Sequence, residues 1–465
     1  MAIKLSSNDK NTVLDAIRRG EIDTADIAFP NLIDDIIIKM KNMGMIDEFA
    51  DILGDKRRDN SEIPFNAVLA LFTAAKMKIH TSLTDVPFAI TDAAVLSEIG
   101  WNIWDSERSL SEGLMTEGTI RNIVAKYEPE EIVSAYNNFV QESVFNRMEI
   151  HPNIHILDCT WLEVDINNTN YERSEVTKED GVAARGYKLA SLRGITGDSG
   201  ILEEIKIGSI KTHDLALSED MLKNSQVFNQ GDILINDRGF ISRELLNYMK
   251  TKRGVDTYIP LKKNMNAFEM AVSVAKEQNS WKEHPNKKRN KQKIAFVDSL
   301  GVYWESDEPE NDVEINACVV MDTSCVGTEY EFRVFITTNL KATARQIIKT
   351  YELRPEIEED YRQIKDFWKI EDFKSTKYKF IVFHVIMVLV GYLYFQLFRL
   401  LPEGKPYIGK SLPVALKKYV PDGQRSVVCY WRSSFGIFGL LEFMDIYASL
   451  DTTIRTLLRS VLAKV

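Results

Sequence analysis

The chain has few cysteines and lacks several common motifs. Its 465 residues include four cysteines, too scattered for a disulfide framework and with no CxxC pair: Cys159, Cys318, Cys325 and Cys429. This usage predicts a reduced, intracellular compartment and argues against a structural zinc site. The first twenty residues contain no apolar signal core, so secretion is not expected. No GxxxxGK[ST] loop is present, so ATP binding is not expected either.

Long apolar runs are almost absent. The exception is Phe380–Phe398, 19 residues without a formal charge, with Lys379 before it and Arg399 after it. That length is at the lower limit for crossing a bilayer, so a membrane-anchored protein is one hypothesis. His384 and Gln396 lower the hydropathy of the run, and a helix buried inside a large domain has the same pattern. We therefore expect a buried helix and no membrane association.

The chain also lacks the positive charge that is typical of proteins coating DNA. Its net charge is −10. Residues 1–150 carry 15 Lys+Arg and 25 Asp+Glu (15 − 25 = −10), whereas residues 399–465 carry 10 and 5 (10 − 5 = +5). This balance argues against non-specific DNA coating. It does not exclude local basic patches, because physiological salt confines charge effects to about 8 Å.

The pattern of apolar residues changes along the chain. Residues 1–150 have helical periodicity and predict a helical N-terminal domain for DNA binding or dimerisation. From residue 151, β-branched runs alternate with helical stretches, which predicts an α/β domain with a mixed sheet flanked by helices. We expect that domain at 151–261 and 331–400, with a β-rich insertion at 262–330 between its parts and a helical C-terminal region at 401–465.

The stretch YELRPEIEEDYRQIK combines a tyrosine, an arginine, a glutamate and a lysine at helical spacing. At about 100° per residue, Tyr351, Arg354, Glu358 and Lys365 fall on one narrow stripe. Pro355 interrupts this pattern, because proline inside a helix breaks or kinks it. We expect one helix to end near Arg354 and the next to begin with Pro355 at its first position. Glu358 and Lys365 then still share a face.

Two aspartates follow apolar strands. Asp158 comes near the end of the apolar stretch IHILDCT, and Asp237 comes directly after DILIN. Open α/β sheets place their active sites at the carboxyl ends of strands, although a single aspartate there is more often a turn or a cap. Together with Glu358, the two aspartates offer three hard oxygen ligands of the kind that Mg²⁺ prefers.

This constellation resembles a known family. Asp158, Asp237 and Glu358, with the Y-x2-R-x3-E-x6-K pattern at 351–365, are similar to the DDE transposases of the insertion-sequence-four type. The resemblance implies a ribonuclease-H-like catalytic domain with a β-rich insertion between the second aspartate and the glutamate. It also implies that the three carboxylates are catalytic and bind Mg²⁺ or Mn²⁺ as two ions.

The resemblance further implies a function and partners. The expected activity is metal-dependent cleavage and strand transfer of insertion-element ends. Tyr351, Arg354 and Lys365 would bind DNA phosphates. The partners would be double-stranded DNA (terminal inverted repeats and target DNA) and a second copy of the chain in a synaptic complex, in a cytoplasmic, nucleoid-associated location. The alternative is a domesticated, transposase-derived protein that binds or nicks DNA without transposition.

The remaining candidates have simpler interpretations. His151 and His155 have the spacing of helical metal ligands but lie in strand-like sequence, so we expect a structural role. His213 precedes a helix and is expected to be a cap or a core residue. The basic run 285–293, PNKKRNKQK, is typical of a solvated loop, yet its charge density makes it a candidate for DNA backbone contact.

Overall fold

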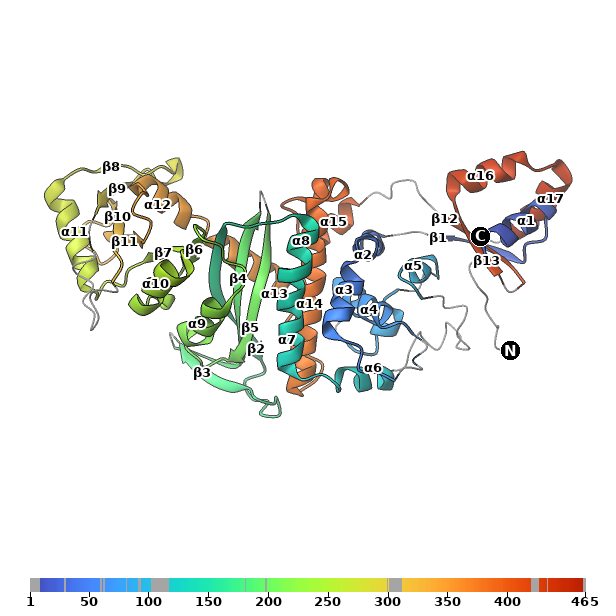
Figure 1. Cartoon of the computed structure of the whole chain (residues 1–465), viewed down its shortest axis with the longest axis horizontal. Helices are drawn as coiled ribbons and strands as arrows, with labels where there is room; N and C mark the ends of the chain where they lie inside the picture. Colours follow the sequence, from blue (N-terminus) through green and yellow to red (C-terminus); the bar gives the residue numbers. More distant parts are fainter. Residues whose placement is uncertain are drawn as a thin grey trace. The chain divides into compact units, whose positions relative to one another are not determined.

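The computed structural model divides into two compact units (Figure 1). The central unit is Val140–Gln363, and the terminal unit combines Met1–Phe139 with Ile364–Val465. The structure describes the chain except for residues 1–8, 29–30, 59–60, 62, 81, 91–92, 102–116, 180, 197–198, 299, 301–311, 420–425, 433 and 463–465. The predicted domain divisions at residues 150, 261, 330 and 400 remain a prediction.

A mixed sheet forms the core of the central unit. Within the described residues it has ten strands in the order β3-β4-β2-β6-β7-β11-β10-β9-β8, and β5 pairs with β4. The strands are β2 (Ile154–Val164), β3 (Glu175–Glu179), β4 (Val182–Thr196), β5 (Ser199–Ser209), β6 (Ile233–Asn236), β7 (Asp256–Pro260), β8 (Lys282–Glu283), β9 (Gln292–Val297), β10 (Asn316–Asp322) and β11 (Phe332–Thr337).

The middle of this sheet is parallel and its flanks are antiparallel. β2 pairs with β6 and β6 with β7 in parallel, whereas all other neighbours run antiparallel. Parallel neighbours need crossover connections, and the helices between β2 and β7 supply them. β6 has the sequence ILIN, with Leu234, Ile235 and Asn236 buried, as is typical of a strand that is covered on both faces.

Helices flank the sheet, and the predicted mixed α/β architecture is confirmed at that level (Figure 1). α9 packs against β4 and β5, α11 against β9, β10 and β11, and α12 against β7, β9, β10 and β11. The helices are α8 (Phe145–Met148), α9 (Asp214–Asn224), α10 (Arg243–Tyr248), α11 (Asn266–Gln278), α12 (Ala344–Tyr351) and α13 (Pro355–Asp366), the last of which extends beyond the central unit.

The region expected to be a β-rich insertion contains a helix that the sequence did not predict. α11 occupies the first part of 262–330, and the strands that follow it continue the main sheet through β11. The buried positions of α11 are Ala267, Ala271 and Ala275, spaced four residues apart. Alanine gives a weak hydrophobic signal, so the helical periodicity of this segment was easily missed.

A long apolar helix lies in the terminal unit. α14 (Tyr378–Leu400) is long and apolar enough to cross a membrane, but its side chains are buried from Ile381 to Arg399. It packs against α2 (Leu32–Asn42), α4 (Phe65–Met77), α6 (Glu117–Val124) and α7 (Pro129–Asn138). The expectation of a buried helix is confirmed. The same unit contains α3 (Met45–Leu53), α5 (Ala93–Glu98) and α15 (Leu412–Lys418).

The two ends of the chain form a small module within the terminal unit. β1 (Thr24–Ala28) pairs antiparallel with β12 (Ser426–Trp431), which pairs with β13 (Ser434–Gly439). Helices α1 (Lys10–Arg19), α16 (Leu440–Ser449) and α17 (Thr452–Leu462) complete it around one apolar cluster. The prediction of helix alone at both ends missed these strands.

Candidate active site

The two aspartates lie side by side where the parallel pairing of β2 and β6 ends. Asp237 directly follows β6, whereas Asp158 lies inside β2 and not near its end as the sequence predicted, because β2 continues beside β4 to Val164. In the β2–β6 pair, Leu157 is opposite Asn236, and Asp158 and Asp237 are the next residues along each strand. Asp158 is buried, with 8% of its surface exposed. The side chain of Asp237 is 39% exposed and accepts a hydrogen bond from the amide of Arg238 at 2.6 Å. The sheet therefore presents two carboxylates where parallel sheets place their sites.

The third carboxylate comes from a helix that begins at a proline. α12 ends at Tyr351 and α13 begins at Pro355, so the predicted break is confirmed. Glu358 lies in the first turn of α13, and its side chain is 53% exposed. Proline suits the first position because the amide that it lacks would have no partner there. The break also places Tyr351 on a different helix from Glu358.

Contacts that the sequence did not predict fix α13 against the sheet. The hydroxyl of Tyr361 donates a hydrogen bond of 2.7 Å to the main-chain carbonyl of Asp158. Arg193, a buried residue of β4, lies 2.6 Å from Asp360 and 2.8 Å from Glu356. These contacts set the position of Glu358 relative to Asp158.

The guanidinium of Arg354 stands between the three carboxylates. Its Nη2 atom lies 3.0 Å from Oδ2 of Asp158 and 3.4 Å from Oδ2 of Asp237. Its Nη1 atom pairs with Oε1 of Glu358. The side chain of Arg354 is only 15% exposed. Three segments that are far apart in the sequence therefore converge on one cation.

Burial and charge together set the protonation of this group. Burial raises the pKa of Asp158 to about 6, although the charge of Arg354 lowers it. Burial, followed by the negative charge of Asp237, also raises the pKa of Tyr351. The ring of Tyr351 lies 4.7 Å from that of Phe335, centroid to centroid. The tyrosine is therefore neutral at neutral pH.

Lys365, the lysine of the Y-x2-R-x3-E-x6-K pattern, pairs with a residue outside the acidic group. The ammonium of Lys365 lies 3.0 Å from Oε1 of Glu371, and both residues belong to the terminal unit. Lys365 follows Glu358 by seven residues along α13, so the two side chains leave the helix on nearly the same face. The structure thus groups Arg354 directly with the carboxylates and pairs Lys365 with Glu371.

The donor chemistry of the acidic group fits a divalent cation. Among the described residues, no three His, Cys, Asp or Glu side chains are close enough together to hold a metal ion. Here the three carboxylates face the guanidinium of Arg354. Their oxygens are the hard ligands that Mg²⁺ prefers, and the point on which they converge already holds a positive charge. The chemistry of these oxygens therefore suits such an ion, but in the described part of the chain their spacing is that of ligands to a guanidinium and not to a metal ion.

The basic run is anchored close to this site. Asn286 donates a hydrogen bond of 3.2 Å to Glu352, and Arg289 lies 3.1 Å from the same carboxylate. Glu352 directly follows Tyr351 at the end of α12. The exposed lysines of the run, Lys287 and Lys288, are consequently held near the segment that carries Arg354.

His155 and His213 have the structural roles that the sequence predicted, whereas His151 is exposed. His155 is fully buried in β2, with Nδ1 2.7 Å from Glu203 and Nε2 3.2 Å from Asp232. His213 caps α9 by accepting a hydrogen bond from the amide of Leu215. Neither side chain contributes to the acidic group.

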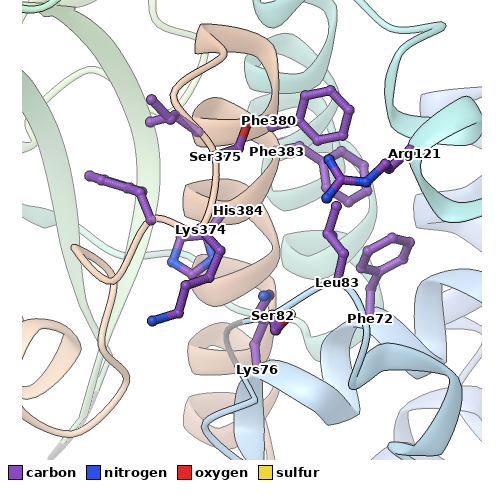
Figure 2. Close-up of a pocket in the computed structure, with 12 residues that line it drawn as sticks. Phe72, Lys76, Ser82, Leu83, Arg121, Lys374, Ser375, Phe380, Phe383 and His384 are labelled. Carbon is purple, nitrogen blue, oxygen red and sulfur yellow. The ribbon is translucent and has the colours of Figure 1, made fainter. Parts of the chain in front are cut away.

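A cavity of about 60 Å³ lies within the terminal unit (Figure 2). Its lining combines aromatic side chains with the basic residues Lys76, Arg121 and Lys374. Burial lowers the pKa of Lys76 to about 8 and that of His384 to about 3, so His384 is neutral at physiological pH. None of the lining residues belongs to the acidic group.

The fold and the site define a mixed α/β domain with an acidic centre where the parallel pairing of β2 and β6 ends. Residues 181–394 match the model of a protein family described as the transposase DDE domain. The matched segment includes Asp237, Arg354, Glu358 and Lys365, and Asp158 precedes it. A comparison with curated proteins found no match. This part of the chain is thus similar to the DDE domain of transposases, which supports a transposase-type function.

Proposed function

We propose that the protein is a DNA transposase that cleaves the ends of an insertion element and joins them to target DNA. The convergence of Asp158, Asp237 and Glu358 on one cationic position carries this proposal. The similarity of residues 181–394 to a transposase DDE domain supports it. We further propose that the central unit has the ribonuclease-H-like fold and that the chain is of the insertion-sequence-four type.

The three carboxylates would hold two Mg²⁺ or Mn²⁺ ions. Such ions, when bound, activate an attacking oxygen and stabilise the leaving oxygen. Water would attack the phosphorus at the element's end, and the 3′-oxygen would leave with a proton as a hydroxyl. That hydroxyl would then attack a phosphorus of the target and lose its proton, and the target's own 3′-oxygen would leave and become protonated to a hydroxyl. These are phosphoryl transfers in which the protein contributes positioning and charge.

The protein's own contacts would provide that positioning. Tyr361 holds α13 to the main chain at Asp158. Arg193 holds the same helix to β4 through Asp360. Because the carboxylates come from two strands and a helix, a shift of α13 would separate Glu358 from the aspartates. Both contacts would therefore position Glu358 beside the two aspartates for the reaction.

DNA would lie along the basic side chains around the acidic group. Tyr351, Arg354 and Lys365 would bind phosphates, and the anchored run 285–293 would extend that surface. The substrates would be terminal inverted repeats and target DNA in a synaptic complex of two chains. The N-terminal helices would bind DNA or form the dimer. We expect a cytoplasmic, nucleoid-associated enzyme.

The test compares alanine variants of the three carboxylates with a matched control. Asp158→Ala, Asp237→Ala and Glu358→Ala should each lower cleavage at least about a hundredfold, because each removes a ligand of the metal pair. Their binding to the same DNA should persist. Glu359→Ala is the control, since Glu359 lies on the same helix but pairs with Arg362.

The assay measures cleavage of a labelled duplex that carries the inverted repeats bracketing the gene, with Mn²⁺ present. Binding is measured on the same duplex by gel shift. Cleavage at the wild-type rate by any one of the three variants would remove that residue from the site. A control variant as inactive as the others would point to general damage of α13.

A further inference from the structure

Arg354 is placed as an internal counter-ion of the acidic group. It lies in the short turn between α12 and α13, and its amide donates a hydrogen bond to the carbonyl of Tyr351. Both of its terminal nitrogens contact the carboxylates, and one nitrogen serves Asp158 and Asp237 together. Three carboxylates at such range repel one another unless a cation lies between them. Arg354 supplies that cation.

The same position is where a divalent ion would have to bind. Arginine keeps its proton at all physiological pH values, so its positive charge cannot be removed by titration. Two cations in contact with the same carboxylate oxygens repel each other strongly in a largely buried setting. An ion can therefore gain all three ligands only when the guanidinium has moved away.

The geometry leaves a direction for that movement. The site is closed on the side of Asp158, whose side chain is 12% exposed, and open on the side of Asp237 and Glu358, at 39% and 53%. Arg354 has a long side chain on a fixed turn, so the guanidinium can reach the open side without a change in the fold. A DNA phosphate there would accept its hydrogen bonds in a bidentate manner.

We propose that Arg354 is a resident cation that blocks metal binding until DNA draws it out of the acidic group. This inference rests on the proposed function and adds that the binding of DNA and the binding of the metal ion depend on each other. DNA phosphate and metal ion would then favour each other's binding, because each stabilises the arrangement in which Arg354 has left the carboxylates. Such coupling is reciprocal, and its usual size is about 5- to 150-fold in affinity.

The test measures metal affinity without catalysis. Mn²⁺ is titrated by calorimetry into the wild-type chain and into Arg354→Gln, each without DNA. We expect Arg354→Gln to bind Mn²⁺ about tenfold more tightly or better, and to show a larger Mn²⁺-induced rise in melting temperature. Arg362→Gln is the control, because this arginine lies on α13 and pairs with Glu359. Its affinity should equal that of the wild type.

A second titration adds the inverted-repeat duplex in Ca²⁺, so that binding is measured apart from cleavage. DNA should raise the wild-type affinity for Ca²⁺ and should have little effect on Arg354→Gln. If Arg354→Gln does not fold, Arg354→Lys takes its place. A single ammonium cannot reach all three carboxylates as the forked guanidinium does, so its Mn²⁺ affinity should lie above that of the wild type.

The outcomes separate this inference from the proposed function. Equal or weaker Mn²⁺ binding by Arg354→Gln, with wild-type binding that is lost in Asp158→Ala, would reject the resident cation and keep the metal site. Absence of Mn²⁺ binding in both the wild type and Arg354→Gln would reject the metal site itself, and the proposed function with it.

Discussion

Replacing His155 with glutamine should destabilise the central unit by an amount that depends on pH. His155 lies on β2, three residues before Asp158, and none of its surface is exposed. Both ring nitrogens face carboxylates, Glu203 at 2.7 Å and Asp232 at 3.2 Å. Glutamine occupies a similar volume but carries no charge. The variant therefore loses both ion pairs and leaves two buried carboxylates without their cation.

The size of the effect follows from the pKa of His155. Burial alone would lower that pKa, but the charge of Glu203 and hydrogen bonds to Asp232 and Glu203 raise it from 6.5 to about 9. A rise of about 2.5 units corresponds to about 3 kcal/mol at 1.36 kcal/mol per unit. Because the pKa of the folded state is the higher one, this stability is fully present below pH 6.5 and is lost as the pH rises through about 9.

The assay compares urea unfolding of the two proteins between pH 6 and pH 9.5. The difference in the free energy of unfolding should be largest at pH 6 and should shrink by about 3 kcal/mol by pH 9.5. His151→Gln is the control, because His151 is exposed and lies four residues earlier in the chain. Its difference from the wild type should not change with pH.

Two results would refute this reasoning. One is a stability difference between the wild type and His155→Gln that stays constant from pH 6 to pH 9.5. The other is an NMR titration in which the ring of His155 changes protonation at or below pH 6.5. Either result would mean that the neutral imidazole, rather than the imidazolium, is the form that the fold holds.

Two further substitutions test the positioning contacts and the cavity. Tyr361→Phe should lower the free energy of unfolding in urea by about 1–2 kcal/mol, because the buried carbonyl of Asp158 loses the hydrogen bond from the tyrosine, and it should also slow cleavage. Tyr330→Phe serves as the control, because Tyr330 is exposed. An unchanged stability of Tyr361→Phe would contradict the contact. Lys76→Met should raise stability at pH 7 by up to about 3 kcal/mol, because burial holds the folded pKa of Lys76 at about 8 instead of 10.5. The wild type gains stability as the pH rises from about 8 towards 10.5, so the difference in the free energy of unfolding between Lys76→Met and the wild type should be smaller at pH 9.5 than at pH 7. A difference that is the same at both pH values would contradict the assigned pKa of Lys76.

The sequence predicted best those features that depend on local pattern. An apolar run followed by a carboxylate placed Asp237 correctly at the end of a strand, whereas Asp158 lies inside β2 at the point where its pairing with β6 stops. The backbone limits of Pro355 placed the break between α12 and α13. The uncharged run from Phe380 to Phe398 predicted a buried helix, and α14 is buried there. In each case the information lies within a few residues of the feature.

Features that depend on distant residues could not be predicted in this way. Spacing placed Arg354 near Glu358, but only the folded chain shows that Arg354 also contacts Asp158 and Asp237. The pair of Arg193 with Asp360 joins positions 167 residues apart. Sequence alone does not tell whether an arginine beside a carboxylate serves an external phosphate or the carboxylates themselves.

The two charged clusters of the central unit belong to one arrangement of strands. His155 on β2 reaches Asp232, which directly precedes β6, and Asp158 and Asp237 follow where the parallel pairing of these strands ends. A slip of β2 along β6 by one residue would turn each side chain to the opposite face and separate both clusters. The first cluster is buried and its imidazole pairs with two carboxylates of the protein, so it can fix the register without a ligand. The second is partly exposed, so its charges are open to metal and DNA. We therefore expect His155→Gln to slow cleavage as well, although His155 touches none of the three carboxylates of the acidic group.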